Sequence, residues 1–464
     1  MDLPVIETPI FQRWVWIGEV AFSHIPIATL ITAFLVLAPI YEYIGYRTRD
    51  LRYDRLAKSM VFFVMILYSP GAALGTGIPM FIIGLWPEFW ARWSNLFFWP
   101  LMAQFGFFLL DVIFLFFFYH LLWERMQNRK RLHIFFGVLT AIFALAIQAV
   151  WDGLGSYMTT PGAVLPQVNE PVGWSAPAFF NPGFLPLFFH RFFGNISYTM
   201  LLTGGVFALR QWRQKDPKEK AYFGFAADLT FTVGFLTFFA MPFVGWFFAN
   251  VMQQHAPVAF YAVMGGHTAS HFTLKLGLIA LMLLAGGGYL FTRHRTKALR
   301  IAMTAGLASL YIVLHLHPPL RWLPGGEFLW RLFYTAALFA AIGGFWYLSR
   351  RAGPVGERWK WAVFAAGLAA FFAFTLGGFV RERSRQPYNV YKQQVKVDVL
   401  PAEADRFLVY DKCIGCHHKS LNDITRAAVA DWERRVEMER QRPGAEISAE
   451  EAARIGRYLK EAFP

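Results

Sequence analysis

Cysteine is almost absent from this chain of 464 residues, which contains only Cys413 and Cys416. Two thiols with no further ligands at suitable spacing exclude a four-ligand zinc site, and a thioredoxin-like dithiol would need a βαβ context that is missing here. Residues 1–14 lack the basic start of a cleavable signal peptide, because they carry Asp2 and Glu7. No internal repeat and no low-complexity tract is evident in the sequence.

Charge is also scarce, since Asp, Glu, Lys and Arg make up 16% of the residues while hydrophobic residues make up 56% and phenylalanine alone contributes 50. With a mean hydropathy of +0.37, this is the composition of a membrane protein and not of a large soluble core. The net charge of +14 would suit nucleic acid. However, the basic residues cluster in short loops between apolar runs, so we expect no nucleic-acid partner.

Apolar runs long enough to cross a bilayer recur along the chain. They lie near residues 15–41, 59–85, 96–122, 133–157, 184–208, 222–250, 262–291, 300–317, 328–348 and 361–380. We therefore expect an all-α polytopic membrane protein with about ten transmembrane helices in bundles, followed by a small C-terminal all-α domain.

The loops between these runs alternate in charge. The loops rich in Lys and Arg are 47–58, 124–132, 209–220, 293–300 and 349–360, and the loops with few basic residues are 86–95, 158–183, 251–261 and 318–327. The positive-inside rule places the first set in the cytoplasm. The N-terminus and everything after residue 381 are then predicted to lie on the outer side.

The two cysteines belong to the stretch Cys413-Ile414-Gly415-Cys416-His417. Cys-x-x-Cys-His is the attachment pattern of a c-type haem, in which both thiols bond the haem and the adjacent His417 is the proximal iron ligand. Met438 is the predicted sixth ligand, because it is the only methionine after the motif and a thioether raises the potential of such a haem. The alternative is a surface methionine on an amphipathic helix.

This tail resembles a small single-haem cytochrome c. The resemblance divides the chain into a transmembrane part, residues 1–383, a polar linker, 384–411, and a cytochrome c domain, 412–464. Haem c is attached on the outer side of the bacterial inner membrane, which agrees with the charge of the loops. We thus expect a multi-pass inner-membrane protein whose N-terminus and C-terminal domain are periplasmic.

Ionisable groups inside spans are costly, so each is a candidate functional group. His24, His190 and Glu382 all fall near the predicted outer face. An imidazole or carboxylate there suits a haem iron, and a nearby arginine such as Arg385 suits a haem propionate. Taken singly, each histidine is also compatible with a hydrogen-bonded residue of the bundle.

Four ordered segments resemble subunit I of the cytochrome bd oxidases, over the first helix to about residue 210 and again over 328–391. They are Phe22-Ser23-His24, Gly155-Ser156-Tyr157-Met158-Thr159-Thr160-Pro161, Asn181-Pro182 with Phe189-His190, and Phe379 to Tyr388 with its Arg-Gln-Pro-aromatic ending. The resemblance implies that His24 ligates one haem of the active pair, Glu382 the other, and His190 the low-spin haem b.

The chain also departs from that family. The family oxidises quinol at an outer loop with a Gln, a Lys and a Glu, whereas the sixth run here ends in residues 250–257 with neither Lys nor Glu. Phe333, beside Arg331, stands near the family's methionine ligand to the low-spin haem, and phenylalanine cannot ligate iron. We place Arg331 among the haem-binding candidates, and ordinary quinol oxidation is in doubt.

A replacement ligand is offered by His267, His271 and Lys275, which share one helical face at i, i+4 and i+8. His271 is the candidate sixth ligand of the haem held by His190, with His267 next and then His315 or His317. The alternative is a polar stripe packed against propionates or water.

Proton supply has weaker signals. Gln104 and Asp111 lie near the family's two glutamates of the third helix, and Asp111 is the candidate proton relay of the catalytic site. Asp228 is a candidate proton entrance, although a paired structural carboxylate is the more common interpretation of each. His120 and His133 flank a basic loop and are expected to be solvated.

The resulting hypothesis is a bd-like terminal oxidase subunit that reduces dioxygen to water and receives electrons through its c-type haem from a cytochrome c or a partner subunit. It implies one covalent haem c, two haems b, a haem d or further haem b, and a membrane partner like bd subunit II. The alternative is an electron-transfer cytochrome b/c subunit between quinol and an outer carrier. Reduction of nitric oxide or another small molecule is a third option.

Overall fold

A computed structural model describes residues 13–161, 173, 175–264, 269–293, 360–384, 431–441 and 447–463, with isolated positions between 301 and 343 and between 400 and 413. The described residues are predominantly helical and contain no β-strand. The prediction of an all-α protein is therefore confirmed.

Eight helical segments in the described part of the chain are long and apolar enough to span a membrane. They are built from α1 (Arg13–Thr48), α2 (Leu51–Leu85), α4 (Phe98–Val112) with η1 (Ile113–His120), η2 (Gln127–Arg129) with α5 (Lys130–Tyr157), α7 (Phe184–Arg213), α8 (Pro217–Phe238) with α9 (Met241–His255), α11 (Ala269–Arg293) and α14 (Lys360–Ser384). These agree with eight of the predicted runs. The predicted runs 300–317 and 328–348 lie outside the described residues, apart from isolated positions.

Local sequence sets where these helices start and stop. Arg49, at φ 58°, takes the left-handed conformation that separates α1 from α2. Asp50 then caps α2, since its side chain accepts a hydrogen bond from the Arg52 N–H. Asp216 caps α8 in the same way and is followed by Pro217 in the first helical turn.

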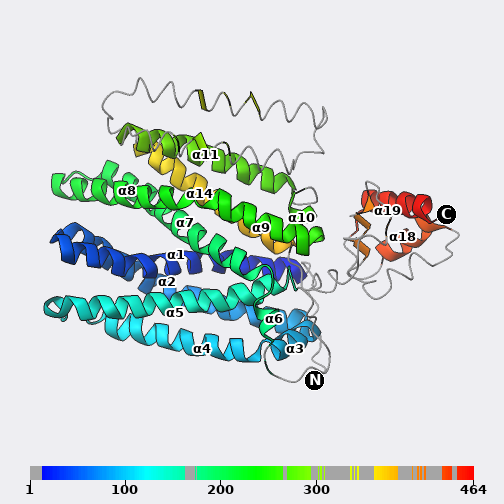
Figure 1. Ribbon diagram of the computed structural model, residues 1–464, viewed down its shortest axis with the longest axis horizontal. Coiled ribbons are helices and arrows are strands. Elements are labelled where there is room, and N and C mark those ends of the chain that lie inside the picture. Colours follow the sequence, from blue (N-terminus) through cyan, green and yellow to red (C-terminus); the bar gives the residue numbers. More distant parts are fainter. Residues whose placement is uncertain are drawn as a thin grey trace.

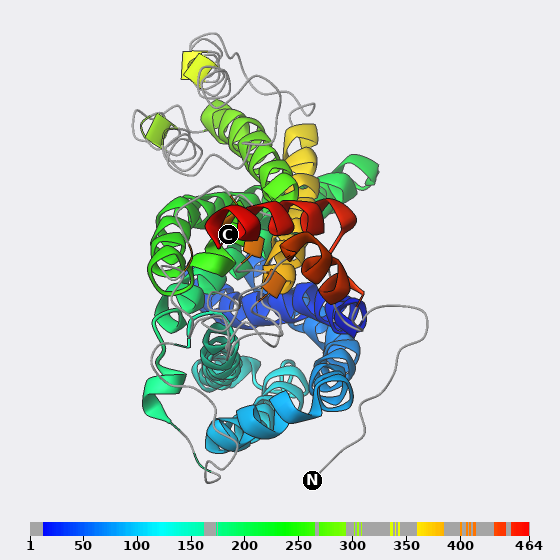
Figure 2. The same cartoon turned by 90° about the vertical axis from the view of Figure 1, so that its right-hand side faces the viewer.

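The spans form two groups, which Figures 1 and 2 show from the side and from one end. In the first group α1 packs on α2 and α5, and α5 packs on α4 and η1. In the second group α7 packs on α8 and α14, and α14 packs on α11. α1 also touches α7 and α14. The first and fifth spans are therefore the seam between the groups.

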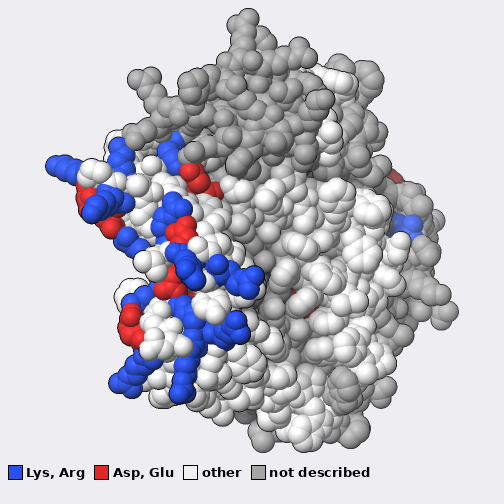
Figure 3. Space-filling model, turned by 60° about the vertical axis from the view of Figure 1, so that its left-hand side comes forward, with Lys and Arg blue, Asp and Glu red and all other residues white. Residues whose placement is uncertain are grey.

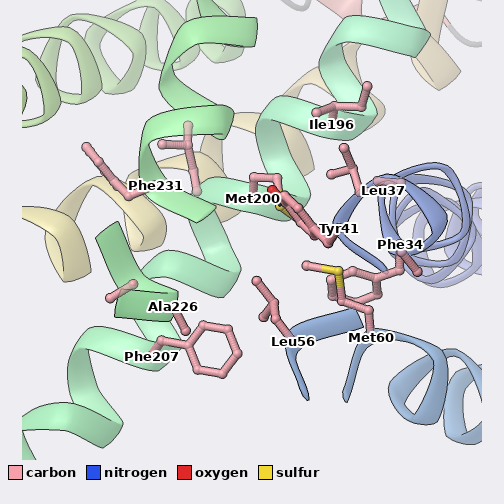
Figure 4. Packing of buried hydrophobic residues seen from close by; sticks show 14 of the residues in the cluster. Phe34, Leu37, Tyr41, Leu56, Met60, Ile196, Met200, Phe207, Ala226 and Phe231 are labelled. Atoms are coloured by element: carbon pink, nitrogen blue, oxygen red, sulfur yellow. Dashed lines mark hydrogen bonds between the residues drawn. The ribbon is translucent and has the colours of Figure 1, made fainter. Parts of the chain in front are cut away.

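The core at this seam is apolar and tightly packed (Figure 4). Tyr41 of α1 reaches Met200 of α7, and Leu56 and Met60 of α2 lie in the same cluster. Close approach of α7 and α8 depends on Gly234, where an added Cβ would lie 2.7 Å from the Leu201 nitrogen. Small residues of this kind allow helix backbones to pack closely within a membrane.

Large apolar side chains also cover the outside of the spans. Phe62, Phe105, Leu109 and Phe117 are each more than half exposed. An apolar exterior of this extent is what contact with lipid or with another membrane subunit requires.

Lysine and arginine gather at one end of the bundle (Figure 3). The exposed basic residues there come from the α1–α2, η1–α5 and α7–α8 connections, and include Arg47, Arg49, Arg52, Arg55, Lys58, Arg125, Arg129, Arg131, Arg213, Lys215 and Lys218. We call this the basic end. The short helices α3 (Pro87–Leu96), α6 (Ala176–Phe179) and α10 (Pro257–Met264) lie at the opposite end (Figure 1).

The C-terminal region has a small core of its own. α18 (Trp432–Arg440) packs against α19 (Ala449–Ala462), and the buried residues include Trp432, Ile455 and Leu459. The Trp432 indole N–H donates to the Phe463 carbonyl oxygen at 2.8 Å. Figure 1 draws this pair of helices beyond the end of the bundle that carries α3, α6 and α10.

Candidate functional site

His24 of α1 is held in one orientation by α2. Its Nδ1 lies 2.9 Å from the Gly71 carbonyl oxygen, which can only accept, so Nδ1 carries the hydrogen. The lone pair is then on Nε2. A hydrogen bond from the other ring nitrogen to a carbonyl oxygen fixes the tautomer of metal-binding histidines in this way.

The α2 surface that faces His24 is made of glycines. A Cβ on Gly71 would lie 3.0 Å from Ile27, and a Cβ on Gly75 would lie 2.8 Å from His24 Cε1. Gly71 and Gly75 are four residues apart and so share one face. Their spacing lets α1 and α2 approach closely, and it is the reason the imidazole fits against α2.

His190 of α7 faces α9. Its ring centroid lies 5.9 Å from that of Phe248, and a Cβ on Gly245 would be 3.7 Å from His190 Cε1. A second imidazole thus lies beside a glycine, in a helix that is in contact with α1. The two predicted histidines belong to neighbouring spans at the seam.

Arg191, the residue after His190, forms a buried ion pair. Its Nη1 donates to Asp152 Oδ1 of α5 at 2.6 Å, and the side chains are 19% and 0% exposed respectively. Gln148 Nε2 donates to the other carboxylate oxygen at 3.2 Å. Arg191 also lies close enough to His24 to affect it electrostatically. A cation is therefore fixed against α5 by the residue that follows His190.

A buried hydrogen-bond network continues from this pair to α1. Asn195 Nδ2 donates to Gln148 Oε1 at 2.9 Å, and Thr29 Oγ1 donates to Asn195 Oδ1 at 3.2 Å. The network joins α5, α7 and α1 through buried polar side chains. Because every member has a partner, it locks the relative positions of the helices that carry His24 and His190.

Asn181 brings two of the singled-out sequence segments together. Its side chain accepts from Thr160 Oγ1 at 3.1 Å and from the Gly183 N–H at 3.1 Å, and its Nδ2 donates to the Gly153 carbonyl oxygen at 3.0 Å. The turn after α5 is thus fastened to the start of α7, which fixes the depth at which His190 lies.

Glu382 lies in the last turn of α14, and its side chain is outside what the structure describes. α14 itself is placed firmly, since Phe374 stacks on Tyr198 of α7 with ring centroids 4.2 Å apart. Arg385 and Arg331 lie outside the described residues. Their assignments stay predictions.

His271 of α11 faces α14. Its ring centroid is 4.9 Å from that of Phe379, and Lys275 Nζ lies 2.8 Å from where a Cβ on Gly377 would be. The predicted polar stripe therefore packs on α14, while His190 packs on α9. The role of His271 as a sixth ligand stays a prediction, and His267 lies outside the described residues.

Asp111 is a buried carboxylate, 2% exposed, in α4. The Tyr68 hydroxyl of α2 donates to its Oδ2 at 2.8 Å, and its Oδ1 is buried with no hydrogen-bond partner. One orphaned oxygen in a low-dielectric site is unusual and fits a group that changes protonation. Gln104 is half-buried on the same helix.

Asp228 ties three helices together. It accepts from the Tyr289 hydroxyl of α11 and from Lys360 Nζ of α14, the latter at 2.8 Å. These contacts favour the structural reading of Asp228 over a proton entrance.

The expectation that His133 is solvated is wrong. Its side chain is buried, with Nδ1 2.6 Å from Glu42 Oε1 and Nε2 2.8 Å from the Tyr119 carbonyl oxygen. The position beside a basic loop suggested solvent, but Glu42 of α1 supplies a buried partner. His120 is half-exposed.

In the C-terminal region Cys413 packs at the edge of the small core, while Cys416 and His417 lie outside the described residues. Met438 is 54% exposed on α18. A thioether that projects from the core is compatible both with a surface methionine and with a ligand to a group beside α18. Its role stays a prediction.

The donor set at the seam fits haem. A tautomer-fixed imidazole lies against a glycine face, a second imidazole lies beside another glycine, and the arginine that follows the second imidazole is held by a buried carboxylate. Haem needs neutral nitrogen ligands, flat surfaces without side chains, and cations for its propionates. Sequence reasoning missed Gly71, Gly75, Asp152 and Arg191, although the Gly-x-x-x-Gly spacing in α2 was a readable signal.

Comparisons with known proteins found one family model and several solved structures that match this chain. The model of a family described as cytochrome bd terminal oxidase subunit I matches residues 13–409. The structure of bd oxidase from Geobacillus thermodenitrificans superposes with a TM-score of 0.54 at 16% sequence identity, and the match covers 74% of this chain and 98% of that chain. No curated protein matches. At this identity the structural match speaks for a shared fold.

Proposed function

Because the chain belongs to the cytochrome bd terminal oxidase subunit I family, we propose that it is a haem-binding oxidase subunit whose electrons enter through a c-type haem. Membership of the family makes it a multi-pass membrane protein of a haem-dependent terminal oxidase. Subunits of this family normally pair with a second membrane subunit and use dioxygen. Family membership does not determine the electron donor or the residues that bind the haem irons, and we propose both.

His24 carries the proposal. Its Nδ1 hydrogen bond to the Gly71 carbonyl oxygen keeps Nε2 available as an iron ligand, and the missing side chain of Gly75 makes room for the ring against α2. Haem supplies the oxygen binding and the electron transfer when it is bound. The chain's own work is to hold ligands, to balance charge and to exclude water.

The other proposed iron ligands lie on α7, α14 and α11. His190 is assigned to the low-spin haem b and Glu382 to the second haem of the active pair, with His271 as the proposed sixth ligand at the low-spin site. Arg191, paired with Asp152, keeps a positive charge near both histidines. The guanidinium has further N–H groups that could donate to a haem propionate.

The electron donor is proposed to be a cytochrome c or a partner subunit on the outer side. The Lys and Glu of the family's quinol site have no counterpart in residues 250–257, and the chain carries Cys413, Cys416 and His417 after its last described span. The loss of one donor site and the presence of another favour a changed donor. The basic end of the bundle would face the cytoplasm, and the C-terminal domain the periplasm.

Oxygen consumption by the purified intact complex tests the donor. We expect uptake of oxygen with reduced soluble cytochrome c and no uptake with a short-chain quinol. Replacement of Cys413 and Cys416 by alanine should abolish uptake from cytochrome c. Uptake that depends on quinol and survives the replacement would contradict a c-linked oxidase.

The haem content provides a second readout. A pyridine haemochrome spectrum of the wild-type complex should show c-type and b-type haem, with a d-type signal if the active pair contains haem d. The double cysteine variant should lose the c-type signal alone. Loss of the b-type signal as well would mean that the C-terminal domain is required for assembly and not specifically for electron entry.

A further inference from the structure

A cluster of ionisable side chains is buried near the basic end of the bundle. It is separate from the residues that surround His24 and His190. Glu42 of α1 lies 2.9 Å from Lys130 Nζ and 2.6 Å from His133 Nδ1, both of α5. Lys130 Nζ also lies 2.5 Å from Asp54 Oδ1 of α2. Tyr119 of η1 packs against His133 with ring centroids 4.9 Å apart. Four helical segments thus contribute to one group of charges.

Side-chain exposure decreases along the cluster from Asp54 through Lys130 to Glu42. The side chain of Asp54 is 22% exposed, that of Lys130 is 9% exposed and that of Glu42 is 0% exposed. Lys130 also lies 4.8 Å from the ring centroid of Trp123, which covers it from the η1 side. Exposed Lys58 and Glu124 form an ion pair nearby at the basic end. This gradation provides a path of polar groups from solvent to a buried carboxylate.

Hydrogen-bond chemistry fixes one proton between Glu42 and His133. The Tyr119 carbonyl oxygen 2.8 Å from His133 Nε2 can only accept, so Nε2 carries a hydrogen. Nδ1 and Glu42 Oε1, 2.6 Å apart, then need a hydrogen between them. The proton resides on Nδ1, giving an ion pair, or on Oε1, giving a neutral pair. Moving it breaks one N–H bond and makes one O–H bond, or the reverse.

Tyr119, which contacts both Glu42 and His133, lies in a segment of unusual backbone geometry. Residues 113–120 form a π-helix, a rare geometry that is enriched at functional sites. The Tyr119 carbonyl oxygen serves His133, and the Tyr119 hydroxyl is buried beside Glu42, where a Cβ on Gly137 would lie 3.0 Å from it. Asp111, with its orphaned oxygen, precedes η1 on the same continuous helix.

We propose that Glu42 and His133 form a proton-holding site at the basic end that supplies protons to Asp111 for oxygen reduction. In this proposal Asp54 and Lys130 connect the site to solvent, and Tyr119 connects it to the buried side towards Asp111. The inference rests on the proposed oxidase function, because only a reaction that consumes protons gives the site a task. A purely structural cluster would hold the helices together and would leave proton supply unchanged.

The test uses the intact complex in lipid vesicles with an excess of electron donor. Glu42→Gln and His133→Gln keep polar side chains of similar size but remove the proton shared between Glu42 and His133. We expect oxygen turnover to fall on the order of 100-fold, the lower end of the range that loss of a positioned acid–base group produces. The fall should deepen as the pH rises, and Glu42→Asp should recover part of the rate.

Controls separate this effect from misfolding and from a failure of the oxidase assignment. Glu219→Gln removes an exposed carboxylate paired with Arg55 at the same end and should leave turnover unchanged. Asp54→Asn, on the solvent side of the site, should slow turnover less than Glu42→Gln. Each variant should bind carbon monoxide as the wild type does. Full turnover in Glu42→Gln or His133→Gln with intact carbon monoxide binding overturns the site, whereas a wild type without oxygen turnover overturns the oxidase.

Discussion

Replacement of Asp152 by asparagine should show how much the seam depends on its buried ion pair. The carboxylate is 0% exposed and accepts from Arg191 at 2.6 Å and from Gln148 at 3.2 Å. The substituted amide would keep the shape of the side chain but leave the Arg191 cation without a counter-charge. Removing one partner of a buried pair costs about 3–5 kcal/mol. Because the Arg191 side chain retains 19% exposure, we expect a loss near the lower end, about 3 kcal/mol.

The assay is unfolding in mixed micelles titrated with sodium dodecyl sulfate and followed by tryptophan fluorescence. Glu219→Gln is the matched control, since it removes one charge from a pair whose side chains are 48% and 32% exposed, and exposed pairs are worth about 0–1 kcal/mol. The double variant Asp152→Asn with Arg191→Gln removes both charges and should be more stable than Asp152→Asn alone. Equal losses for Asp152→Asn and Glu219→Gln would refute the reasoning.

Two other described contacts lead to predictions of their own. Gly75→Ala should displace the His24 ring, because the new Cβ would lie 2.8 Å from Cε1, and should lower the haem content per protein, whereas Gly106→Ala in α4, with nothing within 4 Å of its Cβ position, should not. In the C-terminal region, burial raises the pKa of Glu451, but hydrogen bonds from the Ser448 backbone and from Lys412 outweigh it and hold the pKa below its ordinary value. The stabilisation is therefore complete above the ordinary pKa of about 4.3 and is lost as the pH falls through the lowered value. Hydrogen exchange of α19 in the intact protein should show Glu451→Gln less protected than wild type at pH about 7, with the difference closing below about pH 4; a difference that persists in acid would contradict the assignment.

The spans were readable from the sequence because their signal is a simple one. A run such as 184–208 needs only length and apolarity to be recognised, and α7 extends it by a few polar residues at its C-terminal end. The break between α8 and α9 near Pro242 was not expected, since the hydropathy of the run is continuous there. Hydropathy averages over residues and does not register a local interruption.

The site was only partly readable. His24 and His190 stood out because imidazoles are rare in spans, and family resemblance gave them roles. Their supports did not stand out, since Gly75 and Asn181 act through contacts with residues far away in the chain. His133 shows the same limit, because its burial depends on Glu42, a residue 91 positions away.

Carbon monoxide binding to the reduced complex tests the central claim most directly. The reduced wild-type protein should change its absorption spectrum when carbon monoxide is added, because an oxidase of the proposed kind would need a haem iron that can bind a diatomic gas. His24→Ala should lose that change, and His255→Ala, at an exposed position at the end of α9, should retain it. If carbon monoxide causes no spectral change in the wild type, the oxidase assignment is contradicted and an electron-transfer subunit is favoured. A full spectral change in His24→Ala would show that His24 is not a ligand of the active pair.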